Sequence, residues 1–284
     1  MLDFRYHALS LVAVFLALGI GIVLGSSLGD TVVSQANRDI ANSLRGDLNG
    51  ARRDARGAHA AVAQRERLLS ALFPRLAGTR LAGRTVAVVA SGRMPETVAS
   101  DVRAAVRDAG GARGVVASLA SPPDLAELGA AVGPRFARLR SDDRRLRPLG
   151  RRIGEALVSG GRLARRLTTR FPDRFGGQVA PADAVVLYRD PVAERSPAIK
   201  QIEQGLIEGL RSGGGSIVGV EATETDPSQI PFYSAHGLSS VDDVDSEGGR
   251  IALALALAGA RGTFGYKGTA DAPLPPSASS ARGG

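Results

Sequence analysis

An uninterrupted apolar stretch near the N-terminus constrains this chain more than any other feature. Within residues 8–28 only Ser10, Ser26 and Ser27 break a run of apolar and glycine positions. About 20 such residues in a helix cross the hydrocarbon core of a bilayer. The stretch is therefore long enough to span a membrane, and we place a transmembrane anchor at residues 1–30.

A cleaved export signal is the alternative interpretation of this stretch. Export signals have a shorter apolar region, of about 7 to 15 residues, followed by small residues at the cleavage site. Gly25, Ser26 and Ser27 would provide such residues. The sequence beyond them favours an uncleaved anchor, because residues 33–72 contain no Pro and continue a helix-compatible pattern. We expect a single-pass protein with its N-terminus in the cytoplasm and its C-terminal domain extracytoplasmic.

Residues 41–72 fit a heptad repeat. Its a positions are Ala41, Leu48, Ala55, Val62 and Leu69, and its d positions are Leu44, Ala51, Ala58, Arg65 and Leu72. An apolar seam of this period is typical of coiled coils. The sequence therefore predicts a coiled-coil stalk at residues 31–74, which Pro74 would end.

Small residues within the apolar stretch indicate how two anchors could associate. Gly21, Gly25 and Gly29 recur at every fourth position, a spacing that lets two membrane helices approach closely. Together with the heptad, this spacing favours a parallel homodimer. Its expected contacts are Gly21, Gly25, Leu44, Leu48, Val62 and Leu69. The alternative is a stalk that packs on its own globular domain.

The charge of the chain is concentrated in one segment. The whole chain has a net charge of +8, and thirteen Arg lie between Arg135 and Arg174 against four acidic residues, which gives this segment +9. Such a segment is either a solvated helix face or a binding surface for an anionic partner in the cell envelope. Nucleic acid is not expected, because only Phe136 and Phe171 are available there for base stacking.

The remainder of the chain predicts an α/β fold. Apolar runs at residues 83–91, 112–120, 183–190 and 215–222 are typical of buried strands, and residues 95–109 and about 197–210 of helices. Continuous apolar strands alternating with helices favour a mostly parallel, doubly wound, Rossmann-like domain at residues 83–270. A disordered tail rich in Pro, Ser and Gly is expected at residues 271–284.

Ligands of such sheets bind at the carboxyl ends of the strands. This rule makes candidates of the residues at those ends, Ser91, Gly92, Arg189, Asp190 and Glu221. Neither G-x-G-x-x-G after the first strand nor G-x-x-x-x-G-K-[ST] anywhere is present. We therefore expect no bound cofactor and no catalytic residues.

Metal ligands are sparse. The chain has no Cys, only Met1 and Met94, and three separated histidines, His7, His59 and His236. The acidic run at residues 241–249 resembles the start of a calcium loop, but the position of the required Glu is occupied by Ala254. Capping of the helix that follows, by Ser246 or Asp245, is the simpler interpretation. The weak metal candidates are His236, Asp242, Asp243 and Asp245.

Three stretches together resemble a known family. They are FRYHALSLVAVFLALGIGIVLGSSL near the start, SSVDDVDSEGGRIALALALAG near the end, and GTFGYKGT at residues 262–269. They are similar to the mycobacterial-type copper transport protein family of actinobacteria, the MctB-like proteins. The resemblance implies a role in copper transport or homeostasis in the cell envelope.

The residues favour an indirect role in that process. Copper(I) requires thiolate, thioether or imidazole ligands, which are scarce here. A single membrane helix per chain lines no pore, and no series of alternating strands predicts a barrel. We expect a non-catalytic envelope protein of this family, and the alternative is a homodimeric scaffold or regulator of envelope assembly or cell division.

Overall fold

The computed structural model describes residues 4–119, 124–141, 143–193 and 195–276, and it begins with one long helix. Helix α1 (Phe4–Leu76) has 73 residues. Within it, Tyr6–Gly25 has a mean hydropathy of 2.6 and is long and apolar enough to cross a membrane. The helix continues beyond this segment without a break, as the lack of Pro predicted. A coiled coil of two such helices stays a prediction.

Helix α1 does not end at Pro74, which corrects the expected boundary. A proline removes one backbone donor, and near the end of a helix this costs a single hydrogen bond. The next turn still closes, because the backbone N–H of Ala77 donates to the carbonyl of Phe73 at 2.8 Å. Helix α1 therefore runs two residues past the proline, to Leu76.

The chain divides into two compact units, Met1–Gln64 and Arg65–Gly284. The second unit is built on a sheet with the strand order β3-β2-β1-β4-β5-β6-β7. Its strands are β1 (Thr85–Ser91), β2 (Ala112–Leu119), β3 (Phe175–Gly177), β4 (Ala184–Arg189), β5 (Ser216–Val220), β6 (Ser239–Val241) and β7 (Thr263–Phe264). Strand β3 runs antiparallel to β2, and the other neighbours are parallel. The predicted mostly parallel α/β fold is confirmed, and a Rossmann-like classification stays a prediction.

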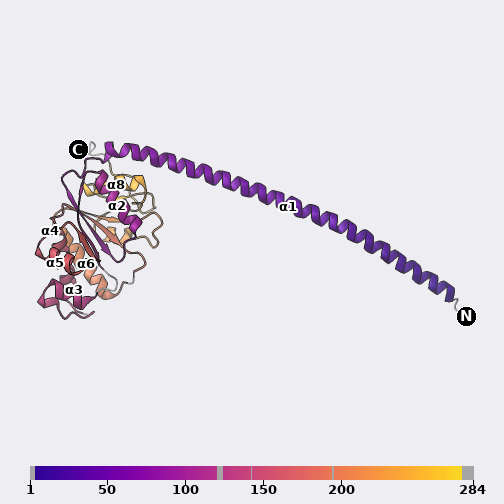
Figure 1. Ribbon diagram of the computed structural model, residues 1–284, viewed down its shortest axis with the longest axis horizontal. Coiled ribbons are helices and arrows are strands. Elements are labelled where there is room, and N and C mark those ends of the chain that lie inside the picture. The colour runs from indigo at the N-terminus through magenta and orange to yellow at the C-terminus, as the bar shows by residue number, and fades with distance from the viewer. Residues whose placement is uncertain (1–3, 120–123, 142, 194, 277–284) are drawn as a thin grey trace. The chain divides into compact units, whose positions relative to one another are not determined.

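Helices cover both faces of this sheet (Figure 1). Helices α2 (Glu96–Asp108) and α8 (Glu247–Leu257) pack on one face. The other face carries α3 (Leu125–Val132), the 3₁₀ turn η1 (Pro134–Phe136), α4 (Leu146–Ser159), α5 (Arg162–Arg170), α6 (Pro197–Arg211) and α7 (Ile230–Ala235). Each face has its own apolar core, so the strands are buried on both sides.

The last turns of α1 belong to the globular unit. Phe73, Ala77 and Leu81 are buried in the core on the α2 and α8 face, and Leu69 packs against that core. Leu69, which was expected to be a dimer contact, is partly buried against its own domain, and its part in a dimer stays a prediction. The alternative interpretation, packing on the chain's own domain, holds for this end of the helix.

The globular unit also extends past residue 270. Within 271–284, residues 271–276 are described and the remainder lies outside the described residues. Ala272 forms a parallel bridge with Phe264, and Leu274 packs against the α2 and α8 core. The first residues of the expected tail are therefore part of the domain.

Candidate functional site

The carboxyl edge of the sheet holds all five candidates that the strand pattern nominated. Strands β1, β4, β5 and β6 run in the same direction, so their last residues meet along one edge. Ser91 of β1 is paired with Arg189 of β4, and Val220 of β5 with Val241 of β6. Glu221 and Asp242, the next residues, consequently leave the sheet side by side.

Glu203 of α6 organises the edge between β1 and β4. The Ser91 hydroxyl donates to Glu203 Oε1 at 2.5 Å, and Arg189 and Arg195 form ion pairs with the same carboxylate at 3.3 and 3.1 Å. The adjoining cavity has a volume of about 10 Å³, which is room for about one water molecule. Ser91 is therefore held by a buried ion-pair network with no space for a substrate.

Arg189 links β4 to α6 and α7. Its guanidinium lies 4.1 Å from the centre of the Phe232 ring, contacts Glu203 and donates to the Gln229 side chain. Its backbone N–H donates to the Tyr233 hydroxyl at 3.0 Å, and burial raises the pKa of Tyr233. A largely covered arginine with these partners stabilises the edge.

Gly92, after β1, and Asp190, after β4, lie in close contact at the same edge. Asp190 accepts backbone N–H groups of Arg93 and Val192, each at 3.1 Å. Gly92 has φ +96°, and a Cβ there would lie 2.5 Å from the Cβ of Asp190. The position requires glycine for steric reasons, and no ligand is needed to explain it.

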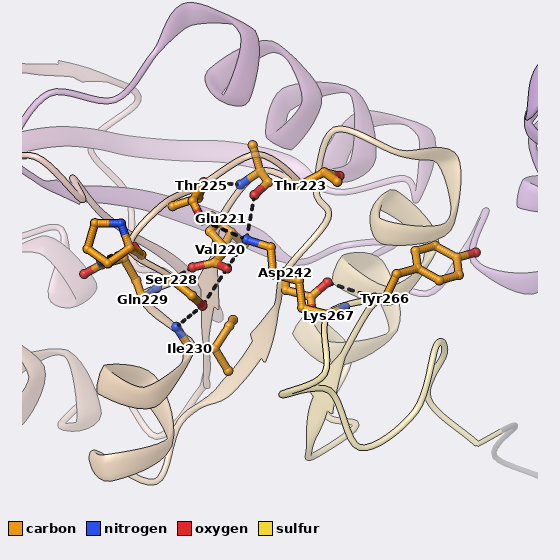
Figure 2. Close-up of polar contacts among 12 residues, drawn as sticks. Val220, Glu221, Thr223, Thr225, Ser228, Gln229, Ile230, Asp242, Tyr266 and Lys267 are labelled. Atoms are coloured by element: carbon orange, nitrogen blue, oxygen red, sulfur yellow. Dashed lines mark hydrogen bonds and ion pairs between the residues drawn. The ribbon is translucent and has the colours of Figure 1, made fainter. Parts of the chain in front are cut away.

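Glu221, at the end of β5, is fully buried and paired with Lys267 (Figure 2). Its Oε1 accepts from the Lys267 ammonium at 2.6 Å and from the Ser228 hydroxyl at 2.8 Å, and its Oε2 accepts from the Gln229 backbone. Lys267 also donates to the carbonyls of Ala222 and Thr225 at 3.2 and 3.1 Å. Both charges are thus satisfied within the chain.

Asp242, at the end of β6, holds the loop that carries this lysine. Its carboxylate accepts the backbone N–H groups of Tyr266 and Lys267 at 2.9 and 3.1 Å (Figure 2). A Cβ on Gly265 would lie 1.9 Å from Asp242 Oδ1. We call residues 265–269, which follow β7, the closing loop, because they cover the carboxyl ends of β5 and β6.

Asp243 is a buried carboxyl group with one unpartnered oxygen. Its Oδ2 accepts from the Ser246 hydroxyl at 2.7 Å, while Oδ1 has no hydrogen-bond partner among the described residues. The pKa of Asp243 is raised to about 6, mainly by burial; the Ser246 hydrogen bond lowers it, and the neighbouring Asp242, Asp245 and Glu66 carboxylates raise it.

Ser246 caps helix α8, which confirms one of the two caps expected, Ser246 or Asp245. Its hydroxyl accepts from the Gly249 N–H at 2.8 Å. Asp245 has a different function, since its Oδ1 accepts from the backbone and the hydroxyl of Thr223 at 2.8 and 2.9 Å. This carboxylate fixes the segment that follows β5.

His236 lies away from the acidic residues, which corrects its grouping with Asp242, Asp243 and Asp245. It follows α7 and precedes β6, so it lies at the amino edge of the sheet. Its Nδ1 is 2.8 Å from the Phe232 carbonyl, and its ring lies 4.3 Å from the Phe232 ring. Within the described residues, no three His, Asp or Glu side chains are grouped to hold a metal ion.

Sequence reasoning missed Glu203, Gln229, Tyr233 and Lys267. A signal for Glu203 was present, because it shares the apolar face of α6 with Ile199, Ile202 and Leu206. An acidic residue on such a face needs a buried partner. No pattern in the sequence identified the partners, which come from other strands and loops.

The comparisons with known proteins decide the family. A model described as copper transport outer membrane protein, MctB, matches residues 1–121 and 171–275. The chain belongs to the MctB family. The match includes both α1 and the closing loop, which confirms the resemblance carried by the terminal stretches. MctB membership implies a copper-transport-related protein of the cell envelope, and with the apolar helix it indicates membrane association.

The matched ranges leave out residues 122–170. This segment contains α3, η1, α4 and α5, and with them twelve of the thirteen arginines counted above. No curated protein matches the chain. The arginine-rich segment therefore lies outside the ranges that the family model describes.

Proposed function

We propose that this MctB-family protein is anchored by α1 and acts in copper transport or homeostasis indirectly, without binding copper tightly and without catalysis. The observation that carries the proposal is the carboxyl edge of the sheet, where Glu203, Glu221, Asp242 and Asp245 are all engaged by groups of the same chain. Among the described residues of this edge only Asp243 keeps a buried, unpartnered carboxylate oxygen, and a single buried carboxyl group does not make a metal site.

The soft ligands of the globular unit support the indirect role. Met94 follows β1 at the carboxyl edge and packs against the α2 and α8 core, whereas His236 lies at the amino edge. Copper(I) needs two or three sulfur or imidazole ligands close together. Two such residues at opposite edges of the sheet do not meet this need.

The anchor is proposed from the continuity of α1. The apolar segment Tyr6–Gly25 passes directly into the remaining helix, with no interruption where a signal peptidase would cut an extended chain. In this proposal the N-terminus is cytoplasmic and the globular unit extracytoplasmic. An N-terminal sequence of the mature protein that began near Ser27 would contradict it.

Copper titration of the full chain in detergent tests the proposal. We expect no site for copper(I) tighter than about micromolar when a chromophoric copper(I) chelator competes, since a tighter site would need at least about 8 kcal/mol from the ligands. A stoichiometric site that resists the chelator would overturn the proposal. In that event His236→Ala and Met94→Leu, compared with the parent, would identify a ligand in the globular unit.

A parallel homodimer is the second part of the proposal. In the first unit, the side chains of Leu44, Leu48 and Val62 are each at least half exposed, at 63%, 50% and 54%. Apolar side chains aligned along a helix are normally covered by a partner. A second copy of the same helix, with Gly21 and Gly25 at the close approach, would cover them.

The same features favour one alternative function. An anchored dimer with an internally occupied sheet edge also suits a scaffold or regulator of envelope assembly or cell division. The copper titration does not separate the two roles, but intracellular copper content does. Deletion of the gene should raise the intracellular copper content if the protein acts in copper homeostasis. It should leave the copper content unchanged if the protein is a scaffold alone.

A further inference from the structure

Residues 122–170 hold nearly all of the excess positive charge of the protein. They contain twelve Arg and five Asp or Glu, a net charge of +7, so the remaining residues carry only +1. All twelve arginines are exposed. An excess of this size over 49 residues produces a strong local positive potential.

Glycines fix the helix that presents these charges. Helix α4 contacts α6 backbone to backbone: a Cβ on Gly205 would lie 1.9 Å from the Arg147 carbonyl, and one on Gly209 would lie 2.1 Å from the Arg151 carbonyl. Gly150 and Gly154 of α4 meet α6 as closely from the other side. The arginines of α4 therefore stand on a rigid scaffold, which lowers the entropic cost of binding.

A groove of about 910 Å³ lies along this scaffold. Its basic side chains are Arg135, Arg147, Arg151 and Arg152, and we call it the arginine groove. Two carboxylates neutralise part of it: Glu208 pairs with Arg147, and Glu155 pairs with Arg151 and Arg152 at 2.9 and 3.4 Å. Four guanidinium groups share two carboxylates, which leaves a net positive groove.

Arg135 is the guanidinium with no carboxylate partner among the described residues of the groove. It lies 4.5 Å from the centre of the Phe136 ring. Beyond the groove the positive surface continues onto α5, where Arg165, Arg166 and Arg170 line a second depression. An extended anion could therefore contact several arginines in sequence.

The surroundings of the groove indicate the class of anion. Guanidinium groups bind both carboxylate and phosphate oxygens, and a phosphate group offers more acceptor oxygens to several arginines at once than a carboxylate does, which favours phosphate groups. Phe136 and Phe171 are buried at 2% and 7% exposure, so neither offers a face for base stacking. These two observations favour a phosphate-bearing polymer without bases.

A lipid surface fits the geometry less well. The end of α1 packs on the α2 and α8 face, whereas the arginine helices pack on the other face of the sheet. We propose that the arginine groove binds an extended, phosphate-bearing polyanion of the cell envelope.

Inorganic polyphosphate is the probe for this proposal. The full chain in nanodiscs of a neutral lipid is titrated with long-chain polyphosphate by calorimetry over a series of salt concentrations. The groove variant is Arg135→Gln, Arg151→Gln and Arg152→Gln together. The matched control is Arg103→Gln, Arg107→Gln and Arg113→Gln together, which removes the same charge from the arginines that line a depression beside α2.

We expect the parent to bind polyphosphate with an affinity that falls steeply with salt. The groove variant should bind at least about 10-fold more weakly, with a slope of log affinity against log salt reduced by about two to three, and the control should stay within about twofold. Equal losses in both variants would show a diffuse charge effect and overturn the proposal. Parent-like binding by the groove variant would do the same.

Two further ligands distinguish other sources of anionic charge. Phosphatidylglycerol vesicles and single-stranded DNA are each measured under the same conditions. Either ligand bound through the groove arginines and more tightly than polyphosphate would overturn the polymer proposal, in favour of a membrane or a nucleic acid. Weaker, groove-independent binding of both would support it. Near-UV circular dichroism of each variant confirms that the domain is folded.

Discussion

The Lys267 ammonium lies 2.6 Å from the carboxylate of Glu221, which has no exposed surface. The lysine belongs to the closing loop, whereas the glutamate directly follows strand β5, 46 positions earlier in the chain. Asp242 holds the same loop by its backbone. The stretch by which the chain resembles its family therefore fastens the last strands of the sheet.

Replacing Lys267 with Met should strongly destabilise the globular unit. The substitution leaves a buried carboxylate without its cation, which costs about 3 to 5 kcal/mol. Urea unfolding of the full chain in detergent, followed by the near-UV circular dichroism of the buried Tyr188 and Tyr233, measures the effect. Lys200→Met, which removes the other lysine, exposed on α6, is the control and should change the free energy of unfolding by less than about 0.5 kcal/mol.

A double variant separates lost charge pairing from lost packing. Glu221→Gln combined with Lys267→Met should be more stable than Lys267→Met alone, because no buried charge then lacks a partner. If Lys267→Met and Lys200→Met unfold at the same urea concentration, the pair does not stabilise the fold.

Gly265→Ala should also destabilise the protein. Gly265 has φ +133°, and the added Cβ would meet Asp242 Oδ1 at 1.9 Å. Backbone strain and this clash together should cost at least about 2 kcal/mol in the free energy of unfolding. The control is Gly268→Ala in the same loop, where nothing lies within 4 Å of the new methyl group. Equal unfolding of both variants would argue against the proposed fastening.

The parts of the fold that could be predicted depend on local signals. Strands β1, β4 and β5 are nearly continuous apolar runs, which are typical of strands buried on both faces. The Ser246 cap follows from a hydroxyl directly before an apolar helix with acidic charge in its first turn. Such features need only neighbouring residues, so the sequence carries them in full.

The parts that could not be predicted depend on partners distant in the chain. In the sequence, Asp242 and Asp245 look like metal ligands. The structure shows that they bind backbone groups of distant residues instead, at 266–267 for Asp242 and at 223 for Asp245. Strands β6 and β7 have three and two residues, too few for a periodic pattern. Leu69 fits the heptad as well as Leu48 does, and only the position of the domain core distinguishes them.

Asp243 should make stability depend on pH. Its pKa is about 6 in the folded protein against an ordinary value of 3.8, so between these values the folded state binds the proton and the unfolded state does not. This contribution to the free energy of unfolding is complete below pH 4 and is lost as the pH rises to about 6. A shift of this size corresponds to about 2 to 3 kcal/mol.

Asp243→Asn removes the titrating group. As the pH rises from 4 to 6, the free energy of unfolding of the variant should therefore increase by about 2 to 3 kcal/mol relative to that of the parent. Above pH 7 the difference between the two proteins should stay nearly constant. Urea unfolding at pH intervals of about half a unit measures the difference. Asp108→Asn, at an exposed carboxylate of α2, removes the same charge and should show no comparable gain. A pH-independent difference between Asp243→Asn and the parent would show that Asp243 does not titrate in this range.

The proposed homodimer is tested at Leu44 and Leu48, and not at Leu69, whose substitution would disturb the domain core. Aspartate at both positions would bury unpaired charge in the seam between two helices, which opposes association by several kcal/mol. We expect crosslinking of the full chain in detergent to fall to the monomer level in this double variant.

The control places Asp at Ser43 and Asn49, which are exposed and lie outside the a and d positions, and it should crosslink like the parent. Because residues 42–49 belong to the first unit and contribute nothing to the buried core, both variants should retain the near-UV spectrum of the parent. Persistent crosslinking of the Leu44 and Leu48 variant would show that this seam does not join the two copies.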